Sequence, residues 1–329
     1  MELFDSLKQK ISGKNKVIVF PEGNDIRIIG AASRLSHDGL VKPILLGDPD
    51  EINKLASEKG FDLTGIKITN PADAPEAEKK ELQDALVERR KGKNTPEQVA
   101  EMLKDPNYWG TMLVYLDQAD GMVSGAVHAT GDTVRPALQI IKTKPGTKRI
   151  IGAFIMQKDE ERYVFADCGI NINPDEEGLA EIAVESAKLA KLFDIDPKIA
   201  LLSFSTKGSA KDDVVTKVAN ATKLAQEKAP DLPIDGELQF DAAFVPEVGE
   251  RKAPGSKVAG HANVFIFPNL EAGNIAYKIA QRLGGFEAYG PILQGLNKPV
   301  SDLSRGANEQ DVYQIAIITV IQSLANESK

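Results

Sequence analysis

The sequence contains a single cysteine and no long apolar segment. With Cys168 alone among 329 residues, no internal disulfide can form, which is typical of proteins from a reducing compartment. No run of about 18 apolar residues occurs, so we expect no membrane-spanning helix and no membrane partner. The segment Met1–Asp5 lacks the basic and apolar regions of a secretory signal. Together these absences predict a cytoplasmic protein.

Basic residues are fewer than acidic ones, and histidines are scarce. The chain carries 40 Lys and Arg against 48 Asp and Glu, a formal net charge of −8, which argues against nucleic acid as a partner. An anionic substrate would have to be held by a few local arginines. His37, His128 and His261 have no metal-ligand spacing, so we expect no metal site. A Gly-x-Gly-x-x-Gly motif is also absent, which weighs against a nicotinamide cofactor.

Short apolar runs alternate with amphipathic helical patterns along the chain. Strands are predicted at 16–20, 43–47, 119–125, 149–154, 163–168, 199–204 and 264–267. Helices are predicted at 26–35, 50–59, 137–141, 175–193 and 311–324. This alternation predicts an α/β protein with parallel layers. A chain of this length suits two domains, and the turn Lys144–Gly146 is the predicted crossover.

Two loops after predicted strands contain residues able to meet an anion. Ser205–Ser209 offers hydroxyls and backbone N–H groups, which could bind a phosphate or cap a helix. Ser301–Asp311 places Ser304 and Arg305 just before a predicted helix. Since seven residues make about two helical turns, Asp311 could face the same side as Ser304. A serine cap with a solvated salt bridge is the alternative, and spacing alone favours it.

Seven segments in order carry a more specific signal than either loop: Phe20–Gly23, Thr133–Gln139, Phe165–Cys168 with Asn171–Pro174, Ser203–Ser209, Asp235–Asp241, Phe267–Leu270 with Gly273–Ile275, and Val300–Gly306. Together they resemble the phosphate acetyltransferase (phosphotransacetylase) family over essentially the full chain. The sequence departs from the family at Ala307–Asn308, where relatives often carry Cys-Ser. That departure removes a thiol but no residue that the mechanism needs.

The resemblance implies two α/β/α domains facing each other across a cleft, as in isocitrate and isopropylmalate dehydrogenases. The first domain would comprise residues 1–145 plus 297–329, and the second residues 146–296. The last segment would thus return to the first domain and place Ser304–Asp311 at the cleft. The family resemblance also implies a homodimer.

The resemblance further implies reversible transfer of an acetyl group between coenzyme A and inorganic phosphate. The family's catalytic positions match Ser304, Arg305 and Asp311. Coenzyme A contacts match Arg90 and Arg135, although Arg89 is an alternative for the first of these. Ser205 and Asn274 are further candidates for cleft contacts. Coenzyme A, acetyl phosphate and phosphate would be substrates, with no tightly bound cofactor.

The implied mechanism is direct attack of the coenzyme A thiol on acetyl phosphate in a ternary complex. Asp311 would take the thiol proton, while Arg305 and Ser304 would stabilise the developing negative charge. An ordinary aspartate and an ordinary thiol differ by about 4.6 pKa units, so proton transfer between them would cost about 6 kcal/mol. An arginine beside the base would widen this gap. We therefore expect Arg305 to contact the phosphate and carbonyl oxygens, and Asp311 to face the sulfur.

Several alternatives remain open at this stage. Cys168 could form an acetyl-enzyme intermediate, although a buried cysteine after a strand is more often a small hydrophobic residue. A phosphate butyryltransferase would share the same chemistry with a larger acyl pocket. An acetyl-CoA-sensing domain would bind without turnover, but it would not need Ser304, Arg305 and Asp311. A decarboxylating dehydrogenase would need clustered aspartates for a metal, and these are not evident.

Overall fold

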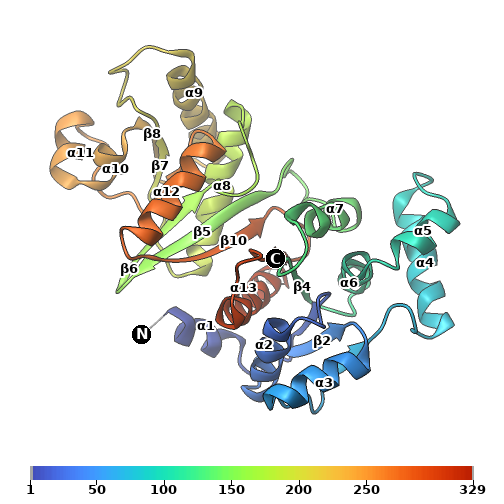
Figure 1. The fold of residues 1–329 in the computed structure, drawn as a ribbon. Helices are drawn as coiled ribbons and strands as arrows, with labels where there is room; N and C mark the ends of the chain where they lie inside the picture. The colour runs from blue at the N-terminus through green and yellow to red at the C-terminus, as the bar shows by residue number, and fades with distance from the viewer. Residues whose placement is uncertain (1–2, 328–329) are drawn as a thin grey trace. The chain divides into compact units, whose positions relative to one another are not determined.

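The computed structural model describes residues 3–327, and the chain divides into two compact α/β units (Figure 1). Unit 1 comprises Met1–Pro145 with Leu296–Lys329, and unit 2 comprises Gly146–Gly295. The predicted boundaries differ from this division at Leu296, which forms an antiparallel bridge with Thr143 in unit 1. As domains of the native protein, the predicted segments stay a prediction. Residues 1, 2, 328 and 329 of the first predicted domain lie outside the described residues.

Unit 1 is built on a parallel sheet with strand order β11-β4-β1-β2-β3. Its strands are β1 (Val17–Phe20), β2 (Lys42–Leu46), β3 (Lys67–Thr69), β4 (Gly121–Ser124) and β11 (Val300–Asp302). Its helices are α1 (Leu3–Ile11), α2 (Ile26–His37), α3 (Pro49–Lys59), α4 (Glu76–Arg90), α5 (Pro96–Met102), α6 (Pro106–Tyr115), α7 (Thr130–Ile140) and α13 (Glu309–Glu327). The strands β4 and β11 are buried along their whole length, as expected for a sheet covered on both faces.

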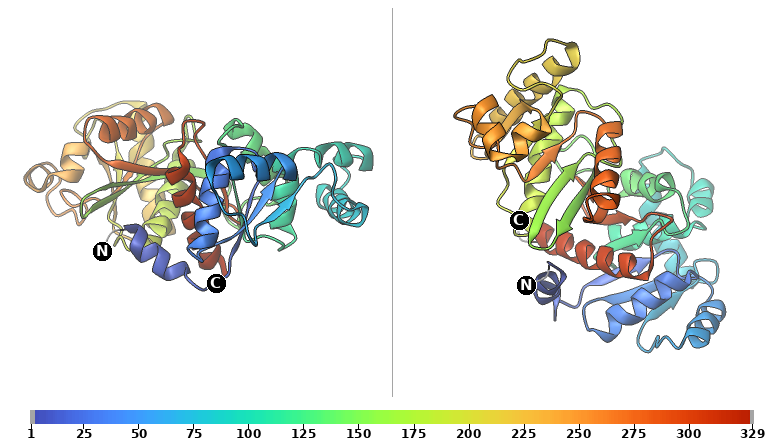
Figure 2. Two further views of the ribbon diagram at one scale, coloured as in Figure 1. Left: turned by 60° about the horizontal axis from the view of Figure 1, so that its bottom comes forward. Right: turned by 60° about the vertical axis from the view of Figure 1, so that its left-hand side comes forward.

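The helices of unit 1 form a layer on each face of its sheet. In one layer α13 packs against α1, α2 and the central strands, and in the other α6 packs against α7, β1 and β4. Figures 1 and 2 show α13 beside α1 and α2, and α4 with α5 standing outside α6. Because α13 is enclosed by its neighbours, nearly all of 312–321 is buried. This burial explains why the C-terminal helix is so apolar.

Unit 2 is built on a mixed sheet with strand order β10-β5-β6-β9-β7-β8. Its strands are β5 (Ile151–Lys158), β6 (Glu161–Ala166), β7 (Ile199–Leu202), β8 (Ile234–Leu238), β9 (Val264–Ile266) and β10 (Glu287–Gln294). Its helices are α8 (Glu176–Leu192), α9 (Asp213–Lys228), α10 (Phe240–Phe244), α11 (Pro246–Lys252) and α12 (Leu270–Arg282). Helices α12 and α8 lie on opposite faces of this sheet (Figures 1 and 2).

The expectation of parallel layers is correct for unit 1 and for β6, β9, β7 and β8, but it is wrong for β10, β5 and β6. These three strands pair antiparallel. Only Asp159 and Glu160 separate β5 from β6, and a two-residue turn permits antiparallel pairing alone. Asp159 has a φ of 53°, as a tight turn of this kind requires. The α/β class is confirmed, with one parallel and one mixed sheet.

Helix α7 begins seven residues before the predicted start at Ala137. It starts at Thr130, so Pro136 lies inside the helix and does not precede it. Proline lacks a backbone N–H, which made it a plausible boundary. The correction matters because it places Thr130 and Thr133 in the first turn of α7, directly after the loop that follows β4.

Candidate active site

Three loops meet at the carboxyl edge of the sheet in unit 1. They are residues 21–25 after β1, residues 125–129 after β4 and residues 303–308 after β11, and these strands are neighbours in the order β11-β4-β1. The chain leaves β1 for β2 on one side, while β4 lies on the other side. Ligands of open α/β sheets bind at such a change of direction. The candidate site is therefore located by topology before any side chain is considered.

Glu22 organises the loop between β4 and α7. Its carboxylate accepts the backbone N–H groups of Ala126 and Val127 at 2.8 Å and of His128 at 2.9 Å. The Nδ1 atom of His128 lies 2.7 Å from Glu22 Oε1. The Glu22 side chain is only 2 % exposed, and buried carboxylates of this kind are stabilised by several charge-assisted hydrogen bonds. The loop thus surrounds one carboxylate that is saturated with hydrogen bonds.

Arg27 ties the three loops together from the start of α2. Its guanidinium pairs with Asp25, which is also the N-cap of α2. The Nη1 atom donates to the backbone carbonyls of Arg305 at 3.0 Å and Ala307 at 2.7 Å, and the Nη2 atom donates to that of Ala126 at 2.9 Å. One planar cation therefore fixes the backbone of the loop after β11 against the loop after β4.

The side chains of Ser304 and Arg305 remain exposed while their backbone is fixed. Ser304 Oγ accepts the N–H of Gly306 at 3.2 Å, and the carbonyl of Arg305 is held by Arg27. A hydroxyl and a guanidinium on a braced loop can meet an oxyanion with little reorganisation. The structure thus leaves both side chains exposed on the loop after β11, and their catalytic role stays a prediction.

The predicted helical relation between Ser304 and Asp311 is wrong. Helix α13 begins only at Glu309, so Ser304 lies in a turn before it. Asp311 Oδ2 accepts the N–H of Asn308 at 2.8 Å, and Asn308 Oδ1 accepts the N–H of Asp311 at 2.9 Å. This reciprocal pair is a capping box, with Asn308 in the place that the capping alternative gave to Ser304. Among the described residues, Arg305 and Asp311 form no ion pair.

The two neighbouring arginines at the end of α4 have different surroundings. Arg89 donates to the carbonyls of Ile140 at 2.6 Å and Ile141 at 3.3 Å, so it caps the end of α7. Arg90 donates to Asn94 Oδ1 at 2.8 Å and lies near Tyr108. Burial raises the pKa of Tyr108, while the charges of Arg135 and Arg90 lower it. Arg90 and Arg135 thus share a neighbourhood around Tyr108, and Arg89 is occupied elsewhere.

Asp302 is a buried carboxyl at this edge to which the sequence analysis gave no role. It is the last residue of β11 and is 1 % exposed. Burial raises its pKa to about 6, the nearby Thr130 and Thr133 hydroxyls lower the pKa, and the charge of Glu22 raises it. A carboxylate inside the motif Val300–Gly306, two residues before Ser304, is the sequence signal that could have identified it.

Glu22 and Arg27 were also missed as individual functional residues. Glu22 stands inside the motif Phe20–Gly23, and Arg27 follows shortly after it. Glycine at 125 is required where the loop passes Asp302, because a Cβ there would lie 2.5 Å from Asp302 Oδ1 and the φ is +104°. These contacts join segments about 100 residues apart or more, so no local pattern reveals them.

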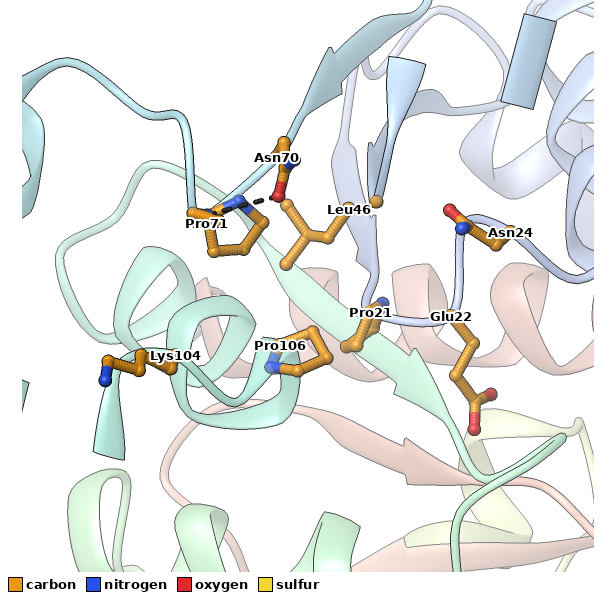
Figure 3. A pocket seen from close by; sticks show the side chains of 11 residues that line it. Pro21, Glu22, Asn24, Leu46, Asn70, Pro71, Lys104 and Pro106 are labelled. Carbon is orange, nitrogen blue, oxygen red and sulfur yellow. Dashed lines mark hydrogen bonds between the residues drawn. The ribbon is translucent and has the colours of Figure 1, made fainter. Parts of the chain in front are cut away.

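A pocket of about 240 Å³ lies beside this site in unit 1 (Figure 3). It is formed by the loops after β1, β2 and β3 and by the start of α6, and is lined by Pro21, Glu22, Gly23, Asn24, Leu46, Gly47, Asn70, Pro71, Ala72, Lys104 and Pro106. Figure 3 shows that the carboxylate of Glu22 points away from Asn70 and Pro71. The pocket and the loop held by Glu22 therefore lie on different sides of the turn after β1.

Ser205 and Asn274, the two weaker candidates, belong to unit 2. Ser205 is fully buried, and its Oγ donates to Glu237 at 2.9 Å and accepts the N–H of Ala210 at 3.1 Å. Asn274 Nδ2 donates to the carbonyl of Cys168 at 3.1 Å, and its Oδ1 accepts from Lys278. These bonds give both side chains a structural role within unit 2. Their predicted contact with substrate stays a prediction.

Cys168 has the surroundings of an unreactive thiol. It is 1 % exposed and belongs to the apolar core of unit 2. Burial raises its pKa well above the ordinary value, and the charge of Asp167 raises it further. Since the thiolate is the nucleophilic form, this environment argues against an acetyl-enzyme on Cys168.

Residues 3–327 also bear on metal binding and membrane insertion. No group of three or more His, Cys, Asp or Glu side chains is arranged to hold a metal ion within that range. In the same part of the chain, no helix is both long and apolar enough to cross a membrane.

Comparison with known proteins supports one family. A family model described as "Phosphate acetyl/butaryl transferase" matches residues 2–320. The phosphate acetyltransferase of Bacillus subtilis (strain 168) is 60 % identical over 323 residues, which cover 98 % of this chain and 99 % of that one. The phosphate acetyltransferase of Staphylococcus epidermidis (strain ATCC 12228 / FDA PCI 1200) is 61 % identical over 328 residues, with the same coverage.

Solved structures agree with the sequence comparison. A phosphotransacetylase from Streptococcus pyogenes is similar to this chain with a TM-score of 0.95 and 58 % identity, covering 98 % of both chains. A more distant structure from Salmonella typhimurium, described as a 4-hydroxythreonine-4-phosphate dehydrogenase, has a TM-score of 0.54 at 14 % identity. The latter likeness concerns the fold alone, and it agrees with the predicted dehydrogenase-like architecture.

Proposed function

Because the chain belongs to the phosphotransacetylase family, we propose that it catalyses reversible acetyl transfer between coenzyme A and inorganic phosphate. The relatives named phosphate acetyltransferase are about 60 % identical over nearly the full chain, which favours acetyl over a longer acyl group. The observation that carries the proposal is the bracing of the Arg305 and Ala307 carbonyls by Arg27. It leaves the Ser304 hydroxyl and the Arg305 guanidinium free to meet a substrate on a fixed backbone.

The phosphoryl group of acetyl phosphate would lie beside Ser304 and Arg305. The first turn of α7 faces the same edge, and its N-cap Ala129 supplies no side-chain cap. Uncapped N–H groups at the start of a helix favour an anion, and they add to the charge of Arg305. The phosphate is therefore held by one cation, one hydroxyl and backbone donors, all of them within unit 1.

The thiol of coenzyme A would attack the carbonyl carbon of the bound acetyl phosphate in a ternary complex. The new bond joins sulfur to the carbonyl carbon, and the carbon–oxygen bond to phosphate breaks. Asp311 would accept the thiol proton, and its capping bond to Asn308 would hold the carboxylate in place. Arg305 and Ser304 would stabilise the charge that develops on the carbonyl and phosphate oxygens.

Coenzyme A would be bound through its phosphates by Arg90 and Arg135. The two side chains lie around Tyr108, whose hydroxyl donates to Gln139 Oε1 at 2.9 Å. Arginine suits phosphate because its planar fork can form two parallel hydrogen bonds. The bonds of Arg89 to the end of α7 favour Arg90 over Arg89 for this role. Coenzyme A is a substrate in this proposal, and no bound cofactor takes part.

We also propose that the protein is a homodimer. Helix α12 presents Ile275, Ile279 and Leu283, which are 57 %, 52 % and 85 % exposed, at intervals of four residues. Such a stripe on a helix is typical of a covered surface. A Leu283→Glu variant is expected to shift the molar mass measured by light scattering toward the monomer. An unchanged mass would place the contact elsewhere. The predicted cytoplasmic location rests on the sequence alone.

The test of the proposed function is an assay of the full chain with acetyl phosphate and coenzyme A, followed by thioester absorbance. Wild type is expected to turn over rapidly, and Asp311→Asn to lose about 100-fold in kcat. Asp231→Asn, in the exposed turn before β8 of unit 2, is the matched control and should keep full activity. Butyryl phosphate run beside acetyl phosphate measures acyl selectivity.

Each outcome of this assay is informative. No turnover by folded protein with either acyl phosphate would overturn the proposed function. Turnover with unchanged kcat in Asp311→Asn would leave the reaction standing and remove Asp311 as the base. Faster turnover with butyryl phosphate would shift the proposal to the butyryl branch of the same family.

A further inference from the structure

A buried polar cluster lies beneath the proposed phosphate site in unit 1. It consists of Asn107 on α6, Ser124 at the end of β4, Thr133 on α7 and Asp302 at the end of β11. The first three are fully buried, and Asp302 is 1 % exposed. Ser124 and Asp302 are register partners in the parallel sheet, so their side chains stand on the same face. Four polar side chains from four elements thus occupy one water-excluded region.

This cluster is not internally satisfied. Ser124 Oγ donates to Asn107 Oδ1 at 2.7 Å, so that hydroxyl proton does not serve Asp302. Among the described residues, Asn107 Nδ2, Thr133 Oγ1 and Asp302 Oδ1 are each buried without a hydrogen-bond partner of good geometry. Native proteins leave few such atoms, because each loses the hydrogen bond that water would supply in the unfolded chain. Three in one cluster therefore require an explanation beyond packing.

Asp302 directly precedes the loop that carries Ser304 and Arg305. Leu303, the next residue, donates its N–H to the Ser124 carbonyl at 2.7 Å and so continues the sheet. Asp302 Oδ1 lies against Gly125 on one side, and the hydroxyls of Thr130 and Thr133 lie on the other. A change in the bonding of this carboxyl is therefore transmitted directly to the loop.

The charges around Asp302 are dominated by acids. The charged and titratable groups on the surrounding elements are Glu22, Arg27, Asp105, His128, Asp132, Arg135, Arg305, Glu309 and Asp311. Arg27 is paired with Asp25. Burial raises the pKa of Asp302, and of these charges Glu22 raises it further. Glu22 is saturated by three N–H groups and His128, whereas Asp302 has an oxygen without a donor. Of the two carboxyls, Asp302 is the one that gains from a proton.

We propose that Asp302 is a positioning residue of the oxyanion site, which takes up a proton when a divalent oxyanion binds beside Ser304 and Arg305. The proton comes from solvent, and no bond to the substrate forms or breaks. In its protonated form Asp302 donates a hydrogen bond to Thr133 Oγ, which fastens the root of the loop to the first turn of α7. This inference rests on the proposed function, because it assumes the oxyanion site described there.

The reason is electrostatic coupling between the bound oxyanion and Asp302, a buried carboxyl two residues before Ser304. A dianion beside Arg305 adds negative charge near a carboxyl that is already destabilised by burial. Anion binding and proton binding then favour each other, and the coupling must be reciprocal. Over the range in which Asp302 titrates, the oxyanion should bind more tightly as the pH falls. If the Asp302 carboxyl were already neutral, or were replaced by an amide, the affinity for the oxyanion would not depend on pH in this way.

The experiment measures proton uptake when sulfate binds to the full chain. Sulfate is a divalent oxyanion that does not itself titrate between about pH 5 and 8. Uptake is followed with an indicator dye in weakly buffered solution at about pH 6.5, with potassium chloride of equal ionic strength as reference. We expect about half a proton per bound sulfate in wild type, and an affinity that weakens about tenfold from pH 6 to pH 8.

Asp302→Asn keeps the shape of the protonated carboxyl and removes its titration. It should bind sulfate without proton uptake, with an affinity independent of pH and about three- to tenfold tighter than wild type at pH 8. Asp231→Asn removes an exposed carboxylate in unit 2 and should keep the uptake of wild type. Asp302→Leu, which lacks any hydrogen bond, should lose at least about 50-fold in kcat/KM for acetyl phosphate, while Asp302→Asn largely retains it.

The outcomes separate this inference from the proposed function. Acetyl transfer and sulfate binding without proton uptake would overturn the role of Asp302 and leave the function intact. Equal uptake in wild type and Asp302→Asn would assign the proton to another group and overturn the inference as well. Absence of both sulfate binding and turnover would overturn the oxyanion site, and the inference with it. Uptake that is present in wild type and absent in Asp302→Asn would support it.

Discussion

Buried carboxylates stand at the carboxyl ends of strands in both units, but their surroundings differ. In unit 2, Asp167 follows β6 and accepts the N–H groups of Gly169 at 2.8 Å and Ile170 at 2.9 Å, with further bonds from Gly152 and Asn171. Glu237 in the same unit accepts from Ser205 Oγ at 2.9 Å and from the N–H of Gly208 at 2.7 Å. In unit 1, Glu22 is similarly saturated and Asp302 is not.

The difference separates structural from functional carboxylates. A saturated buried carboxylate anchors a loop and has no remaining capacity to respond to a ligand. An incompletely bonded one destabilises the fold locally and is retained where its charge is used. By this criterion the carboxyl edge of unit 2 is a scaffold. The carboxyl edge of unit 1 combines a scaffold, at Glu22 and Arg27, with reactive or responsive groups at Arg305 and Asp302.

The largest effect that tests this distinction between structural and functional groups is a loss of activity at Arg305. Arg305→Ala should lower kcat by about 1,000-fold, since removal of one charged donor at a developing oxyanion costs about 4 kcal/mol. Its free energy of unfolding should stay within about 0.5 kcal/mol of wild type, because the side chain is exposed and only its carbonyl is used structurally. Steady-state kinetics and urea unfolding measure the two quantities. A large loss of stability would mean that Arg305 belongs to the scaffold.

The reverse pattern is expected at Asp167. Asp167→Ala should destabilise the protein by about 3 kcal/mol, because several buried N–H groups lose a charged acceptor. Urea unfolding followed by circular dichroism measures the change, with Asp159→Ala at the exposed turn between β5 and β6 as the control. Unaltered stability would contradict the scaffold role that the hydrogen bonds assign to this carboxylate.

A change in stability of the opposite sign is expected at Asp302. Its pKa in the folded state is about 6, against an ordinary value of 3.8, so the folded state binds more protons than the unfolded state between these values. Stability therefore falls as the pH rises from about 4 to 6, and the cost is fully present above pH 6. Asp302→Asn should raise the free energy of unfolding at pH 7.5 by about 3 kcal/mol, the equivalent of this pKa difference.

The pH dependence of the stability gained in Asp302→Asn distinguishes the loss of a charge from a change in packing. The advantage of Asp302→Asn should decline as the pH falls below 6 and vanish below about pH 3, where the carboxyl is protonated in both the folded and the unfolded state. Chemical unfolding at several pH values follows the difference. An advantage that is constant with pH would point to packing, and a loss of stability at pH 7.5 would mean that the charged carboxylate is favourable.

The sequence was sufficient for the parts of the site that lie close together along the chain. Alternating apolar runs indicated the α/β class, and Ser304 and Arg305 were found because they occupy one loop of a recognisable motif. The β5–β6 hairpin was missed because pairing direction depends on the length of the connection rather than on the composition of the strands. Helix α7 was shortened because Pro136 was taken as a boundary.

The rest of the site depends on contacts between distant segments. Arg27 reaches Ala307 across 280 positions, and Glu22 reaches the loop after β4 across about 104. Hydrophobic period and capping rules are local, so they cannot report such pairs. The predicted helical relation between Ser304 and Asp311 was wrong for the opposite reason. A local helical spacing was assumed where the chain makes a turn, and Asn308 begins the helix instead.

The smallest expected effects separate a substrate-binding from a structural role for the two arginines at the end of α4. Arg90→Ala should raise the KM for coenzyme A about tenfold with little change in kcat, since loss of one phosphate contact weakens ground state and transition state alike. Arg89→Ala should leave that KM unchanged and lower the free energy of unfolding by about 1 kcal/mol, because it frees the carbonyls at the end of α7. The two variants remove the same charge from adjacent positions, so each controls for the other. An elevated KM in Arg89→Ala, with Arg90→Ala unaffected, would assign the coenzyme A contact to Arg89 and make Arg90 the structural member of the pair.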